Sequence, residues 1–220
     1  ARASGVIFEN GETQLSVISG FVITGGSGTL HGNFQIGGGI FCKDSSPRIT
    51  QCEIRENTLV KGDKFYGAGM YLLNSAATIL DCKIFDNNGN GIYIDDGTAQ
   101  VINTFIVGNW GNGYFGVGGM GIREKLFISC VISGNFGKGA GDTGNTHFIN
   151  CTISQNGDSA IDCYFEIPRA TNCIAWANSS NIVCADRVNT LDDKDPRFVR
   201  EGAFNFNRAK TSGNPERTFP

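Results

Sequence analysis

The sequence predicts an all-β solenoid, and two observations lead to that fold class. The first is a six-residue phrase, Cys-x-Ile/Ala-x-x-Asn or a near copy, that occurs six times, with steps of 30, 22, 26, 21 and 22 residues between its asparagines. The second is composition, because 31 glycines and only 18 % charged residues suit a chain of short strands and turns. A repeat of this length indicates units that bury their apolar faces by stacking on one another.

The repeated phrase itself reads as a strand followed by a turn. Its copies are Cys52–Asn57, Cys82–Asn87, Thr104–Asn109, Cys130–Asn135, Cys151–Asn156 and Cys173–Asn178, and a worn copy, Gly20–Gly25, precedes them. The first and third residues are two apart, so in a strand both point to the same face, which we take as inward. The closing asparagine marks a turn, because asparagine tolerates left-handed backbone and forms local hydrogen bonds.

Two further strand signals lie upstream in each unit. The nearer one ends in an inward apolar residue: Ile49, Ile79, Val101, Phe127, Phe148 and Ala170. The farther one is rich in glycine: Gly38–Cys42, Ala68–Leu72, Asn90–Ile94, Gly118–Ile122 and Ser159–Cys163. Three short strands per unit describe one coil of a parallel β-helix. We expect one domain over residues 1–220, of about eight coils ~4.8 Å apart. Its first coils lie in 1–36, its regular coils in 37–185, and a closing segment and tail in 186–220.

Two columns of like residues are predicted inside the solenoid. Their members are Cys52, Cys82, Cys130, Cys151 and Cys173 in one column, and Asn57, Asn87, Asn109, Asn135, Asn156 and Asn178 in the other. We interpret the cysteines as small buried hydrophobes, with disulfide bonds as the alternative. Cys163 and Cys184 are 21 residues apart, about one coil, and are the preferred disulfide pair. No Cys-x-x-Cys occurs, so a zinc site is not expected.

Aromatic residues are predicted to gather on one outer edge. Phe41, Tyr71 and Tyr93 each follow the inward residue of the glycine-rich strand and therefore point outward. Insertions after the repeated asparagine add further aromatic candidates to the same edge: Phe65, Tyr66, Trp110, Tyr114 and Phe115. Three interpretations remain open. The loops cover this surface, another protein packs on it, or sugar rings stack on it.

Residues 37–57, which read Gly-Gly-Gly-Ile-Phe-Cys-Lys-Asp-Ser-Ser-Pro-Arg-Ile-Thr-Gln-Cys-Glu-Ile-Arg-Glu-Asn, resemble phrases of secreted bacterial β-helix repeat proteins. The resemblance is to the right-handed parallel β-helix (pectate-lyase-like) superfamily and covers roughly residues 6–200. It implies a right-handed fold. The superfamily includes pectate lyases, polygalacturonases, phage tailspikes, adhesins and proteins with no known activity, so the fold does not decide the function.

Catalytic and metal-binding candidates are few. Asp95 and Asp96 are a carboxylate pair of the kind glycosidases use, although their setting before Gly97 also suits a structural turn. The Gly-His-Gly and Arg-x-Lys patterns of polygalacturonases are absent. The acidic run Asp192, Asp193 and Asp195 is a candidate calcium site. We expect no catalytic residue and no cofactor, with calcium as the alternative.

Charge and the two ends of the chain complete the expectation. A net charge of −3 does not favour nucleic acid, and no apolar run is long enough for membrane insertion. The chain starts at Ala1 without methionine, which favours a processed precursor and an extracellular or cell-surface location.

The N-terminal coil looks uncovered, so we expect self-association, head to tail or lateral. The sequence thus favours a non-catalytic structural or adhesive protein, such as a fibre or surface-layer subunit. The alternative is a protein that binds or cleaves polysaccharide.

Overall fold

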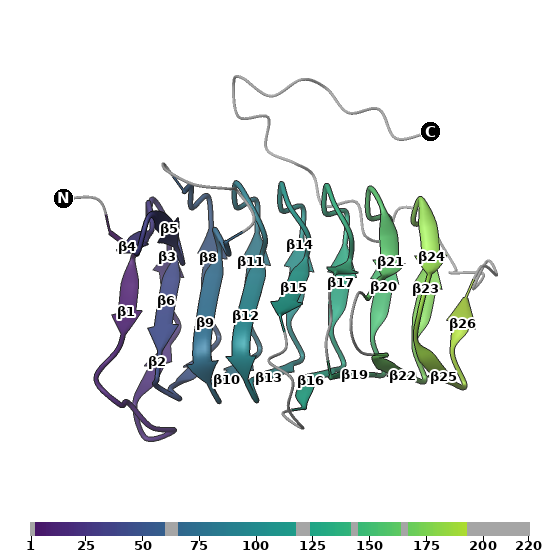
Figure 1. Ribbon diagram of the computed structural model, residues 1–220, viewed down its shortest axis with the longest axis horizontal. Coiled ribbons are helices and arrows are strands. Elements are labelled where there is room, and N and C mark those ends of the chain that lie inside the picture. The colour runs from purple at the N-terminus through teal and green to yellow at the C-terminus, as the bar shows by residue number, and fades with distance from the viewer. Residues whose placement is uncertain (1–2, 60–65, 118–123, 142–144, 164–166, 193–220) are drawn as a thin grey trace.

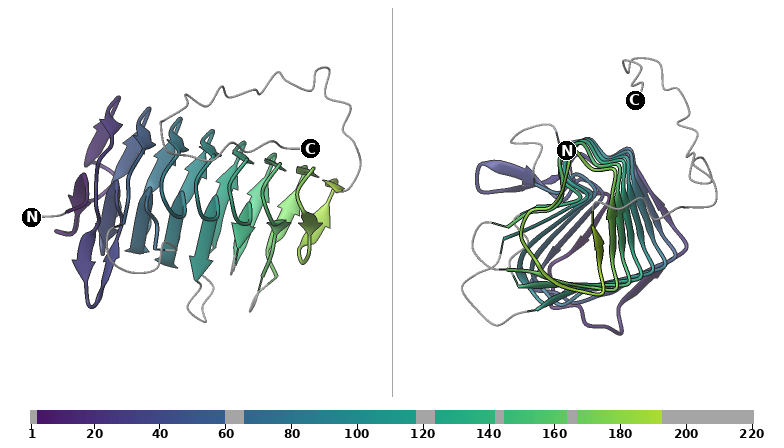
Figure 2. Two further views of the ribbon diagram at one scale, coloured as in Figure 1. Left: turned by 90° about the horizontal axis from the view of Figure 1, so that it is seen from above. Right: turned by 90° about the vertical axis from the view of Figure 1, so that its right-hand side faces the viewer.

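The protein is a rod of stacked coils (Figure 1). The structure is a computed structural model that describes residues 3–59, 66–117, 124–141, 145–163 and 167–192. Its regular elements there are strands, and no helix in this part of the chain is long and apolar enough to cross a membrane. Viewed along the rod, the strands of each sheet lie one behind the other around a common core (Figure 2).

Three parallel sheets run the length of the rod, and each contains eight strands in the described residues. Sheet A contains β1 (Val6–Phe8), β6 (Ile40–Lys43), β9 (Met70–Ser75), β12 (Ile92–Gly97), β15 (Tyr114–Val117), β18 (Ala140–Gly141), β21 (Ser159–Ile161) and β24 (Ser180–Ile182). Sheet B contains β2 (Val17–Ser19), β7 (Arg48–Thr50), β10 (Thr78–Leu80), β13 (Gln100–Ile102), β16 (Lys125–Ile128), β19 (Thr146–Ile149), β22 (Arg169–Thr171) and β25 (Asp186–Val188). Sheet C contains β3 (Val22–Ile23), β8 (Glu53–Arg55), β11 (Lys83–Phe85), β14 (Phe105–Val107), β17 (Val131–Ser133), β20 (Thr152–Ser154), β23 (Ile174–Trp176) and β26 (Leu191–Asp192).

One element departs from this parallel order. An antiparallel hairpin of β4 (Thr29–His31) and β5 (Phe34–Ile36) lies between the first and second coils, at the N-terminal end of the rod in Figure 1. The parallel β-helix predicted from the sequence is therefore the observed architecture, with three short strands in each coil.

Strand register places like residues above one another. Ile40, Met70, Ile92 and Tyr114 occupy equivalent inward positions of sheet A, and all four are fully buried. The strands of sheets B and C contribute Ile49, Ile79 and Ile54 to the same core in the same way. The core is therefore a continuous apolar column, to which each coil adds one layer.

The corner between sheets B and C is a single residue with left-handed backbone. It is the residue directly before each column cysteine or its threonine replacement, with φ between 46° and 54°: Gln51, Asp81, Asn103, Ser129, Asn150, Asn172 and Asn189. A second left-handed residue, such as Glu56 or Asp86, precedes each column asparagine. The sequence prediction was therefore wrong in one detail, because the turn backbone belongs to the residue before the asparagine.

The asparagines form a hydrogen-bonded column inside that second corner. Each Nδ2 donates to Oδ1 of the asparagine in the next coil at 2.9–3.0 Å, from Asn57 through to Asn178. Each Nδ2 also donates to a backbone carbonyl one coil back, as Asn109 does to Ile84 at 3.1 Å. Each Oδ1 in addition accepts from a backbone N–H, so these buried amides satisfy polar groups that would otherwise be costly.

The cysteine column lies at the other corner and makes weaker bonds. Its thiols donate to backbone carbonyls, as Cys151 Sγ does to Phe127 at 3.3 Å, and all five cysteines are free. Thr104 takes the cysteine position in the third copy and donates from Oγ1 to Ile102 at 2.9 Å. A disulfide joins Cys163 to Cys184, which are 21 positions apart in the sequence and have Cα atoms 6.1 Å apart. That bond links the last two described coils.

Candidate binding surfaces

The outward aromatic residues of sheet A form a packed layer. Phe41, Tyr71, Tyr93 and Phe115 are neighbours in register, and the Tyr71 and Tyr93 rings stack with centroids 4.8 Å apart. Phe41, Tyr71 and Tyr93 are only 2, 5 and 6 % exposed. The prediction that they point away from the coil interior agrees with the structure, because they form a cluster separate from the main core.

Local chain covers this aromatic layer, so the prediction of an exposed binding surface on Phe41, Tyr71 and Tyr93 is wrong. Ile36 of the hairpin belongs to the same cluster, and Tyr66 packs against it with its ring 5.7 Å from that of Tyr93. Of the three interpretations drawn from the sequence, the covered surface is the one the structure supports. Phe65, the remaining loop candidate in this group, lies outside the described residues.

Tyr114 was also assigned wrongly, since it lies in the main core. It is fully buried in β15, with its ring 4.5 Å from that of Phe127 and its hydroxyl 3.2 Å from Thr146 Oγ1. Gly116 makes room for it, because a Cβ there would lie 1.9 Å from the Tyr114 hydroxyl. The strand of this coil is Tyr114–Val117, whereas the sequence predicted it at 118–122, a segment outside the described residues.

Trp110 remains as an exposed aromatic candidate, and the structure gives it a partner. Trp110 and Phe136 each follow a column asparagine in adjacent coils, and their rings stack at 6.3 Å with an interplanar angle of 12°. They are 37 and 50 % exposed. Sequence reasoning missed Phe136, although its place directly after Asn135 matches that of Trp110 after Asn109.

The two candidate catalytic carboxylates have structural partners. Asp95 Oδ2 accepts a hydrogen bond from the Tyr71 hydroxyl at 2.7 Å. Burial, followed by this contact with Asp95, raises the pKa of Tyr71 above its ordinary value. Asp96 has left-handed backbone, and its Oδ1 accepts from the Gly97 N–H at 2.9 Å. Asp96 therefore fits the structural-turn interpretation, whereas Asp95 lies in β12 and binds the hydroxyl of Tyr71.

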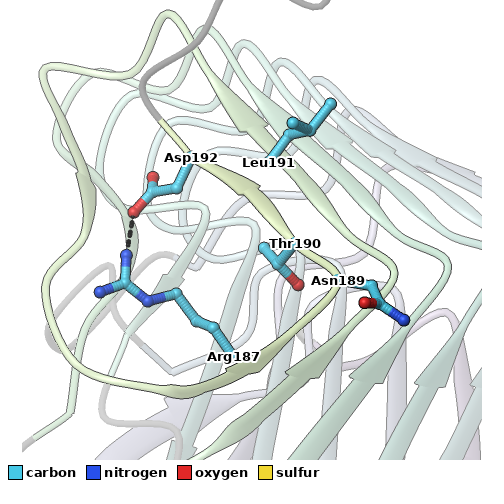
Figure 3. Close-up of a pocket in the computed structure, with 5 residues that line it drawn as sticks. All are labelled: Arg187, Asn189, Thr190, Leu191 and Asp192. Atoms are coloured by element: carbon cyan, nitrogen blue, oxygen red, sulfur yellow. Dashed lines mark hydrogen bonds and ion pairs between the residues drawn. The ribbon is translucent and has the colours of Figure 1, made fainter.

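Asp192, the one member of the acidic run among the described residues, lines a hollow of about 540 Å³ together with Arg187, Asn189, Thr190 and Leu191 (Figure 3). Asp192 Oδ2 faces Arg187 Nη1 at 2.5 Å, and its Oδ1 accepts from the Ile182 N–H at 3.3 Å. Asp193 and Asp195 lie outside the described residues. Within the part of the chain that the structure describes, no three His, Cys, Asp or Glu side chains are grouped to hold a metal ion. Calcium stays a prediction.

A polar cluster on the outer face of sheet B was not anticipated. His147 Nε2 lies 2.9 Å from Thr171 Oγ1, and Glu124 Oε1 lies 3.7 Å from His147 Nδ1 and 2.6 Å from Arg169 Nη2. Burial and the positive charge of Arg169 lower the pKa of His147, against the opposing effect of Glu124. His147 and Arg169 each stand one residue before the inward residue of their strand in adjacent coils. That shared position in the repeat is the sequence signal that could have revealed this cluster.

Comparison with known proteins identifies the family. A family model described as "right handed beta helix region" matches residues 38–192, which is more than half of the chain. The protein therefore belongs to the right-handed β-helix family, and the handedness implied by the resemblance is confirmed. Neither the curated proteins nor the solved structures that were compared with the chain contain a match.

Proposed function

We propose that this protein is a non-catalytic extracellular structural or adhesive β-helix that assembles head to tail through its N-terminal coil. The observation that carries the proposal is the apolar, unpaired edge of that coil. In the described residues, β1, β2 and β3 each end their sheet and pair on one side only. Around them Leu15, Phe21 and Val17 are 92, 60 and 54 % exposed. An open strand edge with apolar side chains is a template for pairing with another chain.

The last described coil has a matching set of strands. Among the described strands, β24, β25 and β26 end the same three sheets, and Val183, Val188 and Leu191 are exposed beside them. In the proposed contact, these strands of one copy continue the sheets of the next copy. A head-to-tail contact of this kind does not close on itself, so it extends into a filament.

The non-catalytic part of the proposal is supported by the roles of the carboxylate candidates. Asp95 holds the hydroxyl of a buried tyrosine, and Asp96 shapes a turn. The extracellular part is supported by the Cys163–Cys184 disulfide, because such bonds persist mainly in oxidising compartments.

The assembly is tested with the double variant Leu15→Glu/Phe21→Glu. Both side chains are exposed, so the changes should leave the coil folded while placing charge on the contact. Ile167→Glu is the matched control, since Ile167 is 63 % exposed on another part of the rod. Sedimentation velocity and electron micrographs should show the wild type and the control forming particles of several 23.5 kDa units. The double variant should remain a monomer.

Two results would contradict the assembly. One is a wild-type protein that stays monomeric at every concentration. The other is a double variant that associates as the wild type does.

The Trp110–Phe136 pair favours a second candidate function, the binding of polysaccharide. Two exposed, nearly parallel aromatic rings on adjacent coils can stack on sugar rings. Affinity electrophoresis through gels containing neutral or acidic polysaccharide should retard the wild type. Trp110→Ala/Phe136→Ala should migrate freely, whereas Ile167→Ala should be retarded. Equal mobility of all three proteins in every gel would exclude this function for the polysaccharides tested.

A further inference from the structure

The outer face of sheet B carries an apolar centre. Two residues of each strand point outward there, and in the middle coils these include Leu80, Ile102, Leu126, Ile128 and Ile149, all of them partly exposed. Their strand neighbours Val101, Phe127 and Phe148 point inward and are fully buried. An exposed sheet face normally alternates apolar inside with polar outside, so aliphatic residues on both faces indicate a surface that packs against something.

Polar residues flank that centre on both sides along one register column of sheet B. Arg48 and Asp186 occupy the same register position as Leu126, and both are exposed. In the sheet order, β7 with Arg48 lies three strands before β16, and β25 with Asp186 lies three strands after it. Gln100 and His147 lie in this column too, one strand before and one strand after Leu126. Arg48 and Asp186, which carry opposite charges, therefore stand at equal distances from the apolar centre, and Arg169, paired with Glu124, lies between His147 and Asp186.

This arrangement makes the face complementary to itself. Consider a half-turn about an axis that is parallel to β16 and lies between the two facing sheets. It sets Leu126 and Ile128 against the same residues of a second copy, and the two rods are then antiparallel. The same rotation sets Arg48 opposite Asp186 of the second copy at both ends of the contact. Further in, it sets Thr78 opposite Arg169 and Gln100 opposite His147. If the axis between the two sheets were parallel to the rod instead, each strand would face the same strand of the second copy. The strand that contains Arg48 would then face its own counterpart, and so would the strand that contains Asp186.

We propose that the outer face of sheet B binds a second copy of this chain, face to face and antiparallel, through Leu126 and Ile128 at the centre and Arg48–Asp186 pairs at the rims. Such a contact is isologous and closes as a dimer. It is separate from the head-to-tail contact of the proposed function, which uses the end of the rod. Together the two contacts would bundle filaments sideways.

The expected affinity of a single pair is low. Six strand steps of ~4.8 Å make the face about 30 Å long, and three residues make it about 10 Å wide. That area is well below the size of a stable interface, so we expect association of isolated pairs at roughly 10–500 µM. In a filament the contact would repeat in every subunit, and the repeated weak contacts would hold the bundle.

Charge exchange tests the proposal. The measurements use the Leu15→Glu/Phe21→Glu background, so that head-to-tail growth does not contribute. In that background Arg48→Asp and Asp186→Arg should each weaken dimerisation about tenfold, because each sets like charges against each other. The double variant Arg48→Asp/Asp186→Arg should restore the original affinity, and its net charge is unchanged. Glu9→Arg, an exposed charge reversal on another face, is the control and should have no effect.

A second variant tests the apolar centre. Ile128→Glu should abolish dimerisation in sedimentation equilibrium, while circular dichroism reports whether the coil is intact. Failure of the background protein to dimerise up to about 500 µM would overturn the proposal. So would single charge variants that dimerise normally, or a double variant that does not recover. If the dimerisation measurements contradict the proposal while the wild-type protein still forms filaments, the head-to-tail assembly stands without the sheet B contact.

Discussion

The asparagine column and the cysteine column run through the same rod at two neighbouring corners, yet the sequence treats them differently. All six regular copies of the repeat keep the asparagine, whereas the third copy replaces the cysteine with Thr104. Both columns are buried. The difference lies in their bonds, because each inner asparagine links two coils through its side chain and also satisfies a backbone N–H. A cysteine fills volume and donates one weak hydrogen bond.

The comparison teaches that a repeat position is strict when it satisfies buried polar groups and permissive when it only fills space. The glycine beside each of the five asparagines from Asn57 to Asn156 belongs to the strict set. A Cβ on Gly113 would lie 2.8 Å from Asn135 Nδ2 and 2.4 Å from Ile132 Cγ2. Thr104, by contrast, fits the cysteine position because its hydroxyl accepts from the Cys82 N–H and donates to Ile102.

The largest expected effect is therefore from Asn109→Ala, in the middle of the asparagine column. Removing this side chain orphans the Asn87 N–H and breaks both column links, so we expect a loss of about 4 kcal/mol in the free energy of unfolding. Urea denaturation followed by circular dichroism measures it. Asn178→Ala, at the partly exposed end of the column, should cost about 1–2 kcal/mol. Equal losses at the two positions would contradict the role given to the column.

A smaller effect is expected from Cys151→Ala in the cysteine column. The variant leaves a small cavity between Cys130 and Cys173 and removes a weak bond to the Phe127 carbonyl, but it orphans no backbone N–H, so the loss should be about 1–1.5 kcal/mol. The same urea titration measures it beside Asn109→Ala. A loss as large as that of the asparagine variant would mean that the two columns do not differ in the way described.

The next prediction concerns pH. Burial raises the pKa of the Cys82 thiol from 9.0 to about 12, so the folded state holds this proton more tightly than the unfolded state does. The contribution of Cys82 is complete below pH 9 and is lost as pH rises towards 12, by about 1 kcal/mol at pH 10. Cys82→Ala should remove that part of the pH dependence in urea titrations at pH 8 and pH 10. If Cys82→Ala lost as much free energy of unfolding between pH 8 and pH 10 as the wild type does, the thiol would not contribute to the pH dependence.

The smallest effect is expected from Thr104→Cys, which completes the cysteine column. The two side chains are similar in size, and the new thiol can donate to Ile102 as the hydroxyl does, so the change should be below about 1 kcal/mol. Thermal unfolding with and without reductant measures it. A large loss would indicate that the Thr104 hydroxyl supports the Cys82 N–H more strongly than a thiol can.

Much of the fold could be predicted because the repeat encodes it. The two-residue spacing of Cys130 and Ile132 indicates a strand with both side chains inward, and the structure buries both. The step between copies indicates one coil, as the Cys163–Cys184 bond between equivalent positions also illustrates. The asparagine was assigned to the corner, but the left-handed backbone of its predecessor was missed, because residues as different as Glu56 and Ala177 adopt it.

The candidate site was harder to predict, because exposure depends on how the loops between the strands fold, which the strand pattern does not encode. Phe41 and Tyr71 point outward as expected, yet a hairpin ending at Ile36 covers them. Tyr114 was misplaced because Gly118-Gly-Met120 resembles the start of a strand more closely than Asn112-Gly-Tyr114 does. The local pattern does not reveal that Gly116 leaves space for a ring inside the coil.

The disulfide between Cys163 and Cys184 gives the rod a mechanical polarity. Hydrogen bonds between coils run along the rod, so a force that pulls the two ends apart loads them one coil at a time. Coils at the N-terminal end can separate one after another, but the disulfide keeps the last two described coils joined. In single-molecule extension, reduction of the bond should release a hidden length of about 70 Å, since 21 residues extend by ~3.3 Å each. Under oxidising conditions, the disulfide would therefore limit how far the protein extends at its C-terminal end.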